Sequence, residues 1–160
     1  MSEIAKPMSE AQVTRATVSP VGNIIKRVSD IVVATVAIAL MLPLLVFCSV
    51  ATFLSSGGRI IARKRRVGFR GRAFEAFSFE TSDEAHVTRL GSALRKGGLD
   101  ELPQLFNVLR GDMSIVGPQP ISGDALDQQA DQAAAYLSCK PGITGLWRVQ
   151  DKSRELESVD

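Results

Sequence analysis

A chain of 160 residues is long enough for one domain with a hydrophobic core of its own. Its 19 Lys and Arg residues nearly balance 17 Asp and Glu residues, so the net charge of +2 does not by itself point to nucleic acid or to any other partner. With only Cys48 and Cys139 the chain has no disulfide framework, which fits a reducing, cytoplasmic setting for its polar part.

The chain begins with a polar lead, residues 1–22, which carries two prolines and no helical period. We expect this lead to be disordered, because it has too few apolar residues to bury. It is not typical of a signal peptide, since no apolar core begins near Met1.

The second region, residues 23–58, contains a long segment without charge. Its 24 residues from Ile31 to Leu54 are enough to cross ~30 Å of hydrocarbon as a helix. A buried helix of a soluble core is the alternative, but such a helix rarely stays uncharged for so long in so small a domain. The segment therefore predicts insertion into a membrane.

Both ends of this segment are basic. Lys26 and Arg27 precede it, and five basic residues between Arg59 and Arg66 follow it. Because basic residues favour the cytoplasmic side of a membrane, we expect the segment to enter and leave on that same face. Pro43, near the middle, lacks an N–H donor and predicts the bend of a re-entrant hairpin. A single kinked crossing is the alternative, and charge alone favours the hairpin.

Three polar side chains of this region have structural interpretations. Asp30, directly before the uncharged segment, either caps the helix N-terminus or pairs with a nearby arginine at the membrane interface. The sequence does not distinguish these two roles. Thr35 or Ser49 could bond the backbone carbonyls that are freed near Pro43.

A basic band follows, with seven cations and no acid between Arg59 and Arg72. As an interfacial anchor, each cation would gain about 1 kcal/mol from anionic lipid. The same band could bind a phosphorylated substrate at the membrane face, with Arg66 as the candidate residue. Phenylalanines alternate with the cations, as in nucleic-acid binders, but the adjacent membrane segment disfavours that interpretation. The run FEAFSF at the end of the band predicts a short strand.

Two acidic residues, Asp100 and Glu101, stand side by side between two predicted helices. The first helix spans about Val87–Lys96 and ends at two glycines, and the second begins near Asp100 and ends at Gly111. The pair would then cap a helix and interact favourably with its dipole, together worth about 1 kcal/mol, and composition alone favours this role. The functional interpretation is a nucleophilic carboxylate with an acidic neighbour, together holding Mg²⁺.

Two Gly/Pro corners, GPQP and KPGITG, come after the second helix, each beside an apolar piece of strand character. The rigid turn of GPQP is expected to hold Gln119 outward, and the second corner places Lys140 beside a turn. Trp147 has two interpretations, a core residue or a residue at the membrane interface.

The motifs occur in one order: KRVSD, the uncharged segment with its proline, RRVGFRG, VTRLGSALRKGGLDELPQLFNVLRGDMSIVGPQP and KPGITGLW. Over about Lys26–Trp147 the chain thereby resembles the bacterial sugar transferases of exopolysaccharide initiation, the monotopic polyprenyl-phosphate phosphoglycosyl transferases. The later motifs are similar to the rhizobial exopolysaccharide type, which loads galactose. The resemblance implies an α/β, mostly helical fold, with a re-entrant membrane helix hairpin, amphipathic interfacial helices and a small cytoplasmic α/β catalytic part over residues 59–160.

The resemblance also implies a reaction at the cytoplasmic face of the bacterial inner membrane. The aspartate of the acid pair attacks a UDP-sugar and forms a phosphosugar-aspartyl intermediate, and undecaprenyl phosphate then takes the phosphosugar, with Mg²⁺ assisting. Carried onto this chain, Asp100 is the nucleophile, Glu101 is its acidic partner, and both are metal ligands. Arg95, Gln119 and Arg66 are the candidates for binding substrate phosphate. Inner-membrane lipids are further implied partners, whereas nucleic acid is not expected.

Four features depart from the family pattern. The run Ser78-Phe79-Glu80 stands where the family has KFR, which exchanges two cations for a hydroxyl and an anion. Gln119 stands where the family has the arginine of GPRP, and an amide cannot supply a guanidinium fork. Arg148 stands where the family has a glutamine, and the chain ends at Asp160, where members usually continue. The alternative function is therefore a catalytically impaired membrane relative that regulates or assembles the exopolysaccharide machinery. Homo-oligomerisation stays open.

Overall fold

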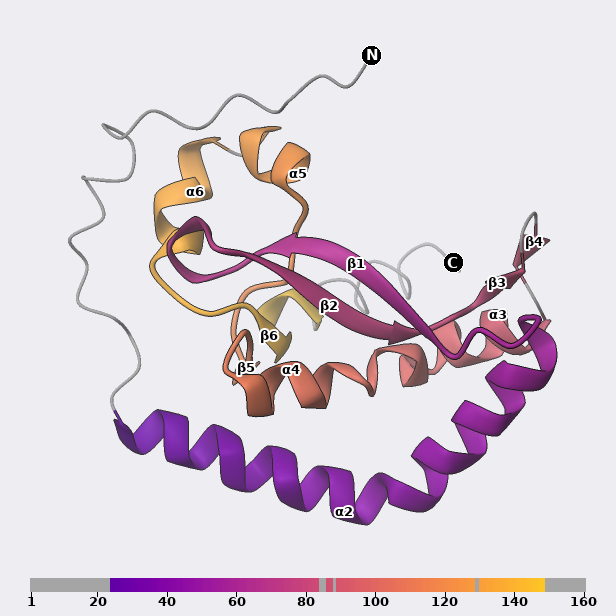
Figure 1. Cartoon of the computed structure of the whole chain (residues 1–160). Helices are drawn as coiled ribbons and strands as arrows, with labels where there is room; N and C mark the ends of the chain where they lie inside the picture. Colours follow the sequence, from indigo (N-terminus) through magenta and orange to yellow (C-terminus); the bar gives the residue numbers. More distant parts are fainter. Residues whose placement is uncertain (1–23, 84–85, 88, 129, 149–160) are drawn as a thin grey trace, which may run out of the picture.

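The computed structural model describes residues 24–83, 86–87, 89–128 and 130–148, so the predicted polar lead lies outside the described residues. A long helix lies along one side of a small mixed part in which short helices surround paired strands (Figure 1). The helices are α2 (Ile24–Ser55), α3 (Arg89–Lys96), α4 (Gln104–Arg110), α5 (Gly123–Gln128) and α6 (Ala130–Leu137), with two 3₁₀ turns, η1 (Phe69–Gly71) and η2 (Leu99–Glu101). The strands are β1 (Ile61–Val67), β2 (Ala73–Phe79), β3 (Ser82–Asp83), β4 (His86–Val87), β5 (Ser114–Val116) and β6 (Gly142–Thr144). The prediction of a mostly helical chain with a small sheet part is confirmed.

The apolar segment forms one helix, α2, which bends near its middle so that both ends rise toward the rest of the molecule (Figure 1). Pro43 lies inside this helix, where it removes one backbone donor and its ring crowds the preceding turn. The helix is bent but is not divided into the two helices of a hairpin. Thr35 and Ser49 donate to the carbonyls of Ile31 and Leu45, one turn earlier, and not to the carbonyl that Pro43 leaves unpaired.

The outer face of α2 is apolar and exposed. Its exposed large side chains include Leu40 (72% exposed), Phe47 (66%) and Leu54 (77%). Within the described residues, α2 is the one helix long and apolar enough to cross a membrane. Only 17% of its most apolar window is buried, whereas the core helix of a soluble protein is mostly buried.

The inner face of α2 packs on the rest of the chain through two apolar clusters, one for each arm of the bent helix. The first arm contributes Ala34 to a cluster with Leu105, Val108 and Met113. The second arm contributes Leu45 and Cys48 to a cluster with Phe79 and Leu94. The bend therefore lets one helix cover both α4 and the neighbouring ends of β2 and α3 with apolar contacts.

Asp30 is buried on the first arm, in the second turn of α2, so it does not cap the helix. Its carboxylate accepts hydrogen bonds from the Ser114 hydroxyl at 2.9 Å and from the Ile115 N–H at 3.1 Å. Lys26, one turn earlier on the same helix, completes the set with an ion pair at 3.2 Å. Both sequence interpretations of Asp30 are therefore wrong. The residue joins α2 to β5 by hydrogen bonds instead of capping the helix, and its ion-pair partner is a lysine and not an arginine.

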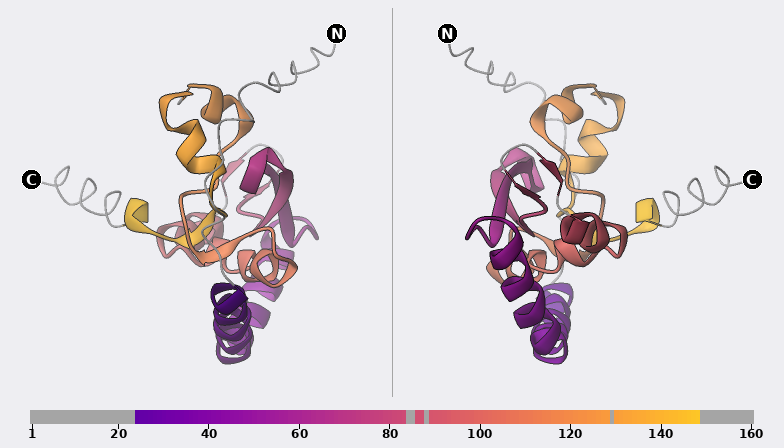
Figure 2. Two further views of the ribbon diagram at one scale, coloured as in Figure 1. Left: turned by 90° about the vertical axis from the view of Figure 1, so that its left-hand side faces the viewer. Right: turned by 90° about the vertical axis from the view of Figure 1, so that its right-hand side faces the viewer.

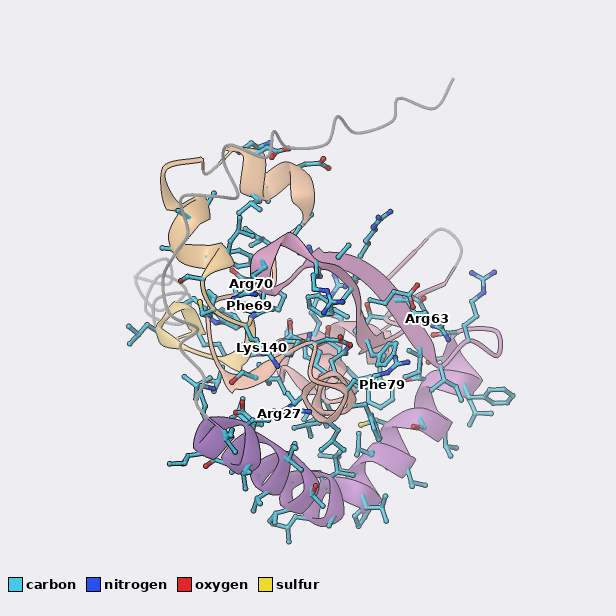
Figure 3. All side chains as sticks on the ribbon, turned by 60° about the vertical axis from the view of Figure 1, so that its left-hand side comes forward. Arg27, Arg63, Phe69, Arg70, Phe79 and Lys140 are labelled. Carbon is cyan, nitrogen blue, oxygen red and sulfur yellow. The ribbon has the colours of Figure 1, made fainter. Side chains whose placement is uncertain are left out.

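A second set of hydrogen bonds joins the start of α2 to the end of α4. Arg27 donates to the carbonyls of Val108 and Leu109 at 2.6 and 2.8 Å, two of the carbonyls that a helix C-terminus leaves without partners. The head groups of Arg27 and Lys140 both lie over Gly111, and Figure 3 shows Lys140 above Arg27. Burial and the neighbouring Arg27 lower the pKa of Lys140.

Strands β1 and β2 form an antiparallel hairpin that pairs Ile61 with Phe79 at one end and Val67 with Ala73 at the other. The β2 strand falls on the predicted FEAFSF run, whereas β1 falls in the basic band, where the sequence pattern predicts no strand. Asn107, which is fully buried, lies along β2. Its side-chain oxygen accepts the N–H of Phe77 at 3.0 Å, and its amide nitrogen donates to the Glu75 carbonyl at 2.7 Å.

Strands β5 and β6 pair in parallel and bring the two Gly/Pro corners together. A Cβ on Gly142 would lie 2.1 Å from the backbone nitrogen of Gly117, so this close approach requires glycine. The helices α5 and α6 lie at the opposite end of the molecule from α2, as both views of Figure 2 show. The exposed apolar face of α2 and the helices α5 and α6 thus lie at opposite ends of the molecule.

Candidate active site

The acid pair lies in η2, the 3₁₀ turn between α3 and α4. Gly98, just before it, has a φ of 65°, a left-handed conformation that glycine adopts without strain and that turns the chain at the end of α3. The residues before η2 and before α4 are Gly98 and Pro103, and neither provides a side-chain cap. The prediction that Asp100 and Glu101 cap a helix is therefore wrong. Both acids lie in the first turn of η2, and their interaction with a helix dipole stays a prediction.

Asp100 is a buried carboxylate, 7% exposed. Within the described part of the chain, no hydrogen bond or ion pair reaches it. Leu99 and Leu102, on either side of the acid pair, pack against the apolar cluster that contains Leu45 of α2. The Asp100 carboxylate is thus available for chemistry next to the second arm of α2.

Glu101 has a partner, because its carboxylate forms an ion pair with the guanidinium of Arg148. Arg148 also lies over the Trp147 ring, 5.1 Å from its centroid, and its Nε donates to the Ile143 carbonyl at 3.5 Å. The sequence assigned Arg148 no role at the site. The sequence marked it only as an arginine where the family has a glutamine, directly after Trp147, and neither signal indicates contact with a residue so far back in the chain.

Arg95, the first candidate for binding phosphate, lies in the last turn of α3, which packs against η2. Its guanidinium donates to the Thr81 hydroxyl at 2.6 Å, and the side chain is exposed. Arg95 therefore offers a solvent-facing cation on the element next to the acid pair, and its role in phosphate binding stays a prediction.

The other two phosphate candidates lie elsewhere. Arg66 is paired with Phe74 on the hairpin, five residues or about 17 Å along β2 from Phe79, which packs beside η2. Its charge acts on Tyr136, so the structure places it toward α6 and does not bring it to the acid pair. Gln119 is exposed, as the GPQP turn predicts, and lines a cavity.

This cavity has a volume of about 610 Å³ and lies between the two Gly/Pro corners and the helices α5 and α6. Its walls include Gln119, Leu126, Tyr136, Cys139 and Trp147. The Trp147 ring nitrogen donates to the Gly117 carbonyl at 3.1 Å, which fixes this half-buried residue in the cavity wall and not in the core; its place at the membrane interface stays a prediction. Burial raises the pKa of Tyr136 and of Cys139, which keeps both neutral at physiological pH.

A magnesium ion would find two carboxylates here, and within the described residues no group of three potential ligands occurs. Mg²⁺ is usually held by one or two carboxylates, several waters and the phosphates of a substrate. Asp100, which lacks a partner in the described chain, and Glu101 therefore fit this ion as a pair that binds it together with substrate.

Comparison with known proteins gives relatives along most of the chain. Exopolysaccharide production protein ExoY of Sinorhizobium fredii is 34% identical over 165 residues, which cover 85% of this chain and 73% of that protein. The undecaprenyl-phosphate galactose phosphotransferase of Salmonella typhimurium is 34% identical over 158 residues, which cover 81% of this chain and 33% of that protein. The UDP-glucose:undecaprenyl-phosphate glucose-1-phosphate transferase of Escherichia coli is 35% identical over 159 residues, which cover 89% of this chain and 34% of that protein. The chain thus spans about a third of the length of each of these two longer enzymes.

The family model described as bacterial sugar transferase matches residues 21–160. This range contains α2, the acid pair and both Gly/Pro corners, the features on which the resemblance in the sequence depends. The prediction of a transferase enzyme of the exopolysaccharide-initiation type is therefore confirmed. The chain belongs to the bacterial sugar transferase family.

Proposed function

We propose that the protein transfers a sugar 1-phosphate from a UDP-sugar to undecaprenyl phosphate, with Asp100 as the nucleophile. The names of the Salmonella and Escherichia relatives support undecaprenyl phosphate as the acceptor, and the Escherichia name supports a UDP-sugar as the donor. The observation that carries the proposal for this chain is the Asp100 carboxylate, which is buried, lacks a partner in the described chain, and stands beside an acid held by an arginine.

The proposed reaction has two displacements at one phosphorus atom. An oxygen of Asp100 attacks the phosphorus that carries the sugar; an oxygen–phosphorus bond forms, and uridine monophosphate leaves with the electron pair of the broken bond. The product is a phosphosugar-aspartyl intermediate. An oxygen of undecaprenyl phosphate then attacks the same phosphorus, and the Asp100 carboxylate leaves, which restores the enzyme. No step requires an oxidant, a reductant or a net proton transfer.

The neighbouring residues supply positioning and charge. Arg148 holds the Glu101 carboxylate next to Asp100, and Arg95 offers a cation on the adjacent helix. Donors and cations arranged before the reaction stabilise the negative charge that develops on the transferring phosphoryl group. Mg²⁺, held by Asp100 and Glu101, would neutralise part of the charge of the donor diphosphate.

The position of the acid pair suits a lipid acceptor. Leu99 and Leu102, which flank the pair, pack on the apolar cluster that contains Leu45 and Cys48 of the second arm of α2. We propose that α2 is a re-entrant membrane helix that lies in the cytoplasmic leaflet of the bacterial inner membrane. Its exposed apolar side would face the lipid chains, and the phosphate of undecaprenyl phosphate would then reach Asp100 from the membrane surface.

Two cysteine positions test this topology. In a chain whose Cys48 and Cys139 are replaced, Asn23→Cys and Lys64→Cys place one thiol before and one after α2. If α2 is re-entrant, both thiols resist a membrane-impermeant maleimide in intact cells and react after the cells are opened. Reaction of the Asn23→Cys variant alone in intact cells would indicate a single kinked crossing.

Galactose is the sugar we propose, because the chain resembles the galactose-loading type and the Salmonella relative is named as a galactose phosphotransferase. The purified protein in lipid nanodiscs is incubated with undecaprenyl phosphate and a panel of UDP-sugars labelled in the sugar. Transfer of label to the lipid fraction, with UDP-galactose the best donor, is expected. Transfer from UDP-glucose alone would correct the sugar but keep the reaction.

Gln119 favours a second candidate function. Its neutral amide lines the cavity at a corner where a charged side chain would bind phosphate more strongly. A protein that lacks this charge could instead regulate or assemble the exopolysaccharide machinery at the membrane. If no UDP-sugar gives labelled lipid while the protein remains folded, this second candidate replaces the first.

A further inference from the structure

The cavity beside the second Gly/Pro corner is not part of the acid pair, yet the structure connects the two. No residue in its described wall carries a charge: glycine, proline and aliphatic side chains surround the amide of Gln119, the phenol of Tyr136, the thiol of Cys139 and the indole of Trp147. Ligand sites of this kind hold an uncharged, flat group on apolar walls and orient it with a few polar atoms.

Among the described residues, Arg148 is the cation that links the cavity wall to the acid pair. Trp147 forms part of the wall, Arg148 lies over the Trp147 ring, and the same guanidinium pairs with Glu101. A ligand that passes from the cavity to Asp100 therefore crosses Arg148. An uncharged cavity that leads to an arginine and then to a nucleophile matches a molecule with a neutral ring at one end and a diphosphate next to it.

We infer that the cavity binds the uracil and ribose of the donor nucleotide and that Arg148 binds its diphosphate. This inference rests on the proposed function and identifies where the donor lies during transfer. Gln119 offers both a donor and an acceptor to the edge of the base, and Trp147 offers an aromatic surface fixed by its hydrogen bond to Gly117. A guanidinium has five N–H donors, so Arg148 can share them between the diphosphate and Glu101. Its pairing with Glu101 then loosens in part when the diphosphate arrives.

The isoprenoid lipid is the other ligand of suitable chemistry, and the fold argues against it. The helices α5 and α6, which supply Leu126, Ala135 and Tyr136 to the cavity, lie at the opposite end of the molecule from the apolar face of α2. A lipid tail in this cavity would have to leave the bilayer. A water-soluble nucleotide reaches the cavity directly.

Fluorescence of Trp147 gives a direct binding assay, because it is the single tryptophan of the chain. The full chain in nanodiscs is titrated with UDP, and quenching of Trp147 reports occupancy. Ala135→Phe fills the cavity, whereas Ala134→Phe adds the same side chain at an exposed neighbour on α6 that does not line it. We expect Ala135→Phe to weaken UDP binding roughly tenfold or more and Ala134→Phe to leave it within about twofold.

Arg148→Met separates the two parts of the inferred site. It should weaken UDP binding about tenfold while leaving the weaker binding of uridine, which has no phosphate, unchanged. The inference would be overturned if Ala135→Phe and Ala134→Phe bound UDP with equal affinity. It would also be overturned if farnesyl phosphate quenched Trp147 and only Ala135→Phe removed that quenching. Transfer of sugar phosphate to lipid in those same samples would leave the proposed function standing, and absence of both UDP binding and transfer in the wild type would contradict both.

Discussion

Two buried aspartates lie in different regions of this molecule and have opposite surroundings. Asp30 and Asp100 are equally buried, each 7% exposed. Asp30, at the junction of α2 with β5, accepts hydrogen bonds from Ser114 and Ile115 and forms an ion pair with Lys26. Asp100, in the turn between α3 and α4, has no such partner within the described chain.

The difference shows how one residue type serves two purposes. A buried carboxylate whose oxygens are all engaged stabilises the contact between the elements that bind it, and its charge is already compensated. A buried carboxylate that is left available retains its capacity to bind a cation or to attack an electrophile. We therefore assign Asp30 to structure and Asp100 to chemistry, and each assignment can be tested by substitution.

The largest effect is expected from Asp100→Asn. The amide has nearly the shape of the carboxylate but is a far weaker nucleophile, so turnover should fall roughly 10⁴-fold or more while the Tm stays within about 2 °C of wild type. Turnover is measured by transfer of labelled sugar phosphate to lipid, and the Tm by intrinsic fluorescence. Activity near the wild-type level would show that Asp100 is not the nucleophile.

Glu101→Gln should have the next largest effect. It removes the charge that pairs with Arg148 and one of the two carboxylates available to Mg²⁺, so turnover should fall about 100-fold. The Mg²⁺ concentration that gives half-maximal rate should also rise. Asp127→Asn, at an exposed acid of α5, is the matched control and should change neither quantity.

Asp30→Ala sharpens the comparison from the structural side. It leaves Lys26, Ser114 and Ile115 without their common acceptor, so the free energy of unfolding should fall by about 2 kcal/mol. The adduct on Asp100 should still form below the lowered Tm. A variant that keeps its stability but loses chemistry would reverse the assignments of the two aspartates.

Gln119→Arg should have the smallest effect. A guanidinium has N–H donors but no acceptor for the edge of the base, so the donor KM should rise about fivefold. Gln128→Arg introduces the same charge at an exposed site on α5 and controls for net charge. Equal KM values for the two variants would show that position 119 does not contact the donor.

Local signals in the sequence predicted the elements around the acid pair. Gly98 and Gly111 end α3 and α4 as expected, because both glycines adopt the left-handed conformation that a helix end favours. The apolar run likewise predicted α2, and Pro43 lies within the bent helix. These features depend on residues close together in the chain.

Contacts between distant residues were not predictable in the same way. Strand β1 exists because it pairs with β2, although its own residues are largely cationic. Asp30 meets Ser114, and Glu101 meets Arg148, across long stretches of sequence. No periodicity records such contacts, so the roles of Asp30 and Arg148 emerge only once the chain is folded.

The central claim is that Asp100 carries the phosphosugar during transfer, and mass spectrometry of the protein tests it most directly. The protein in nanodiscs is incubated with the best UDP-sugar in the absence of undecaprenyl phosphate, quenched, and digested. We expect a phosphosugar on the peptide that contains Asp100, absent from Asp100→Asn and lost when undecaprenyl phosphate is added. Continued transfer to lipid by Asp100→Asn, or an adduct on any other residue, would contradict the claim.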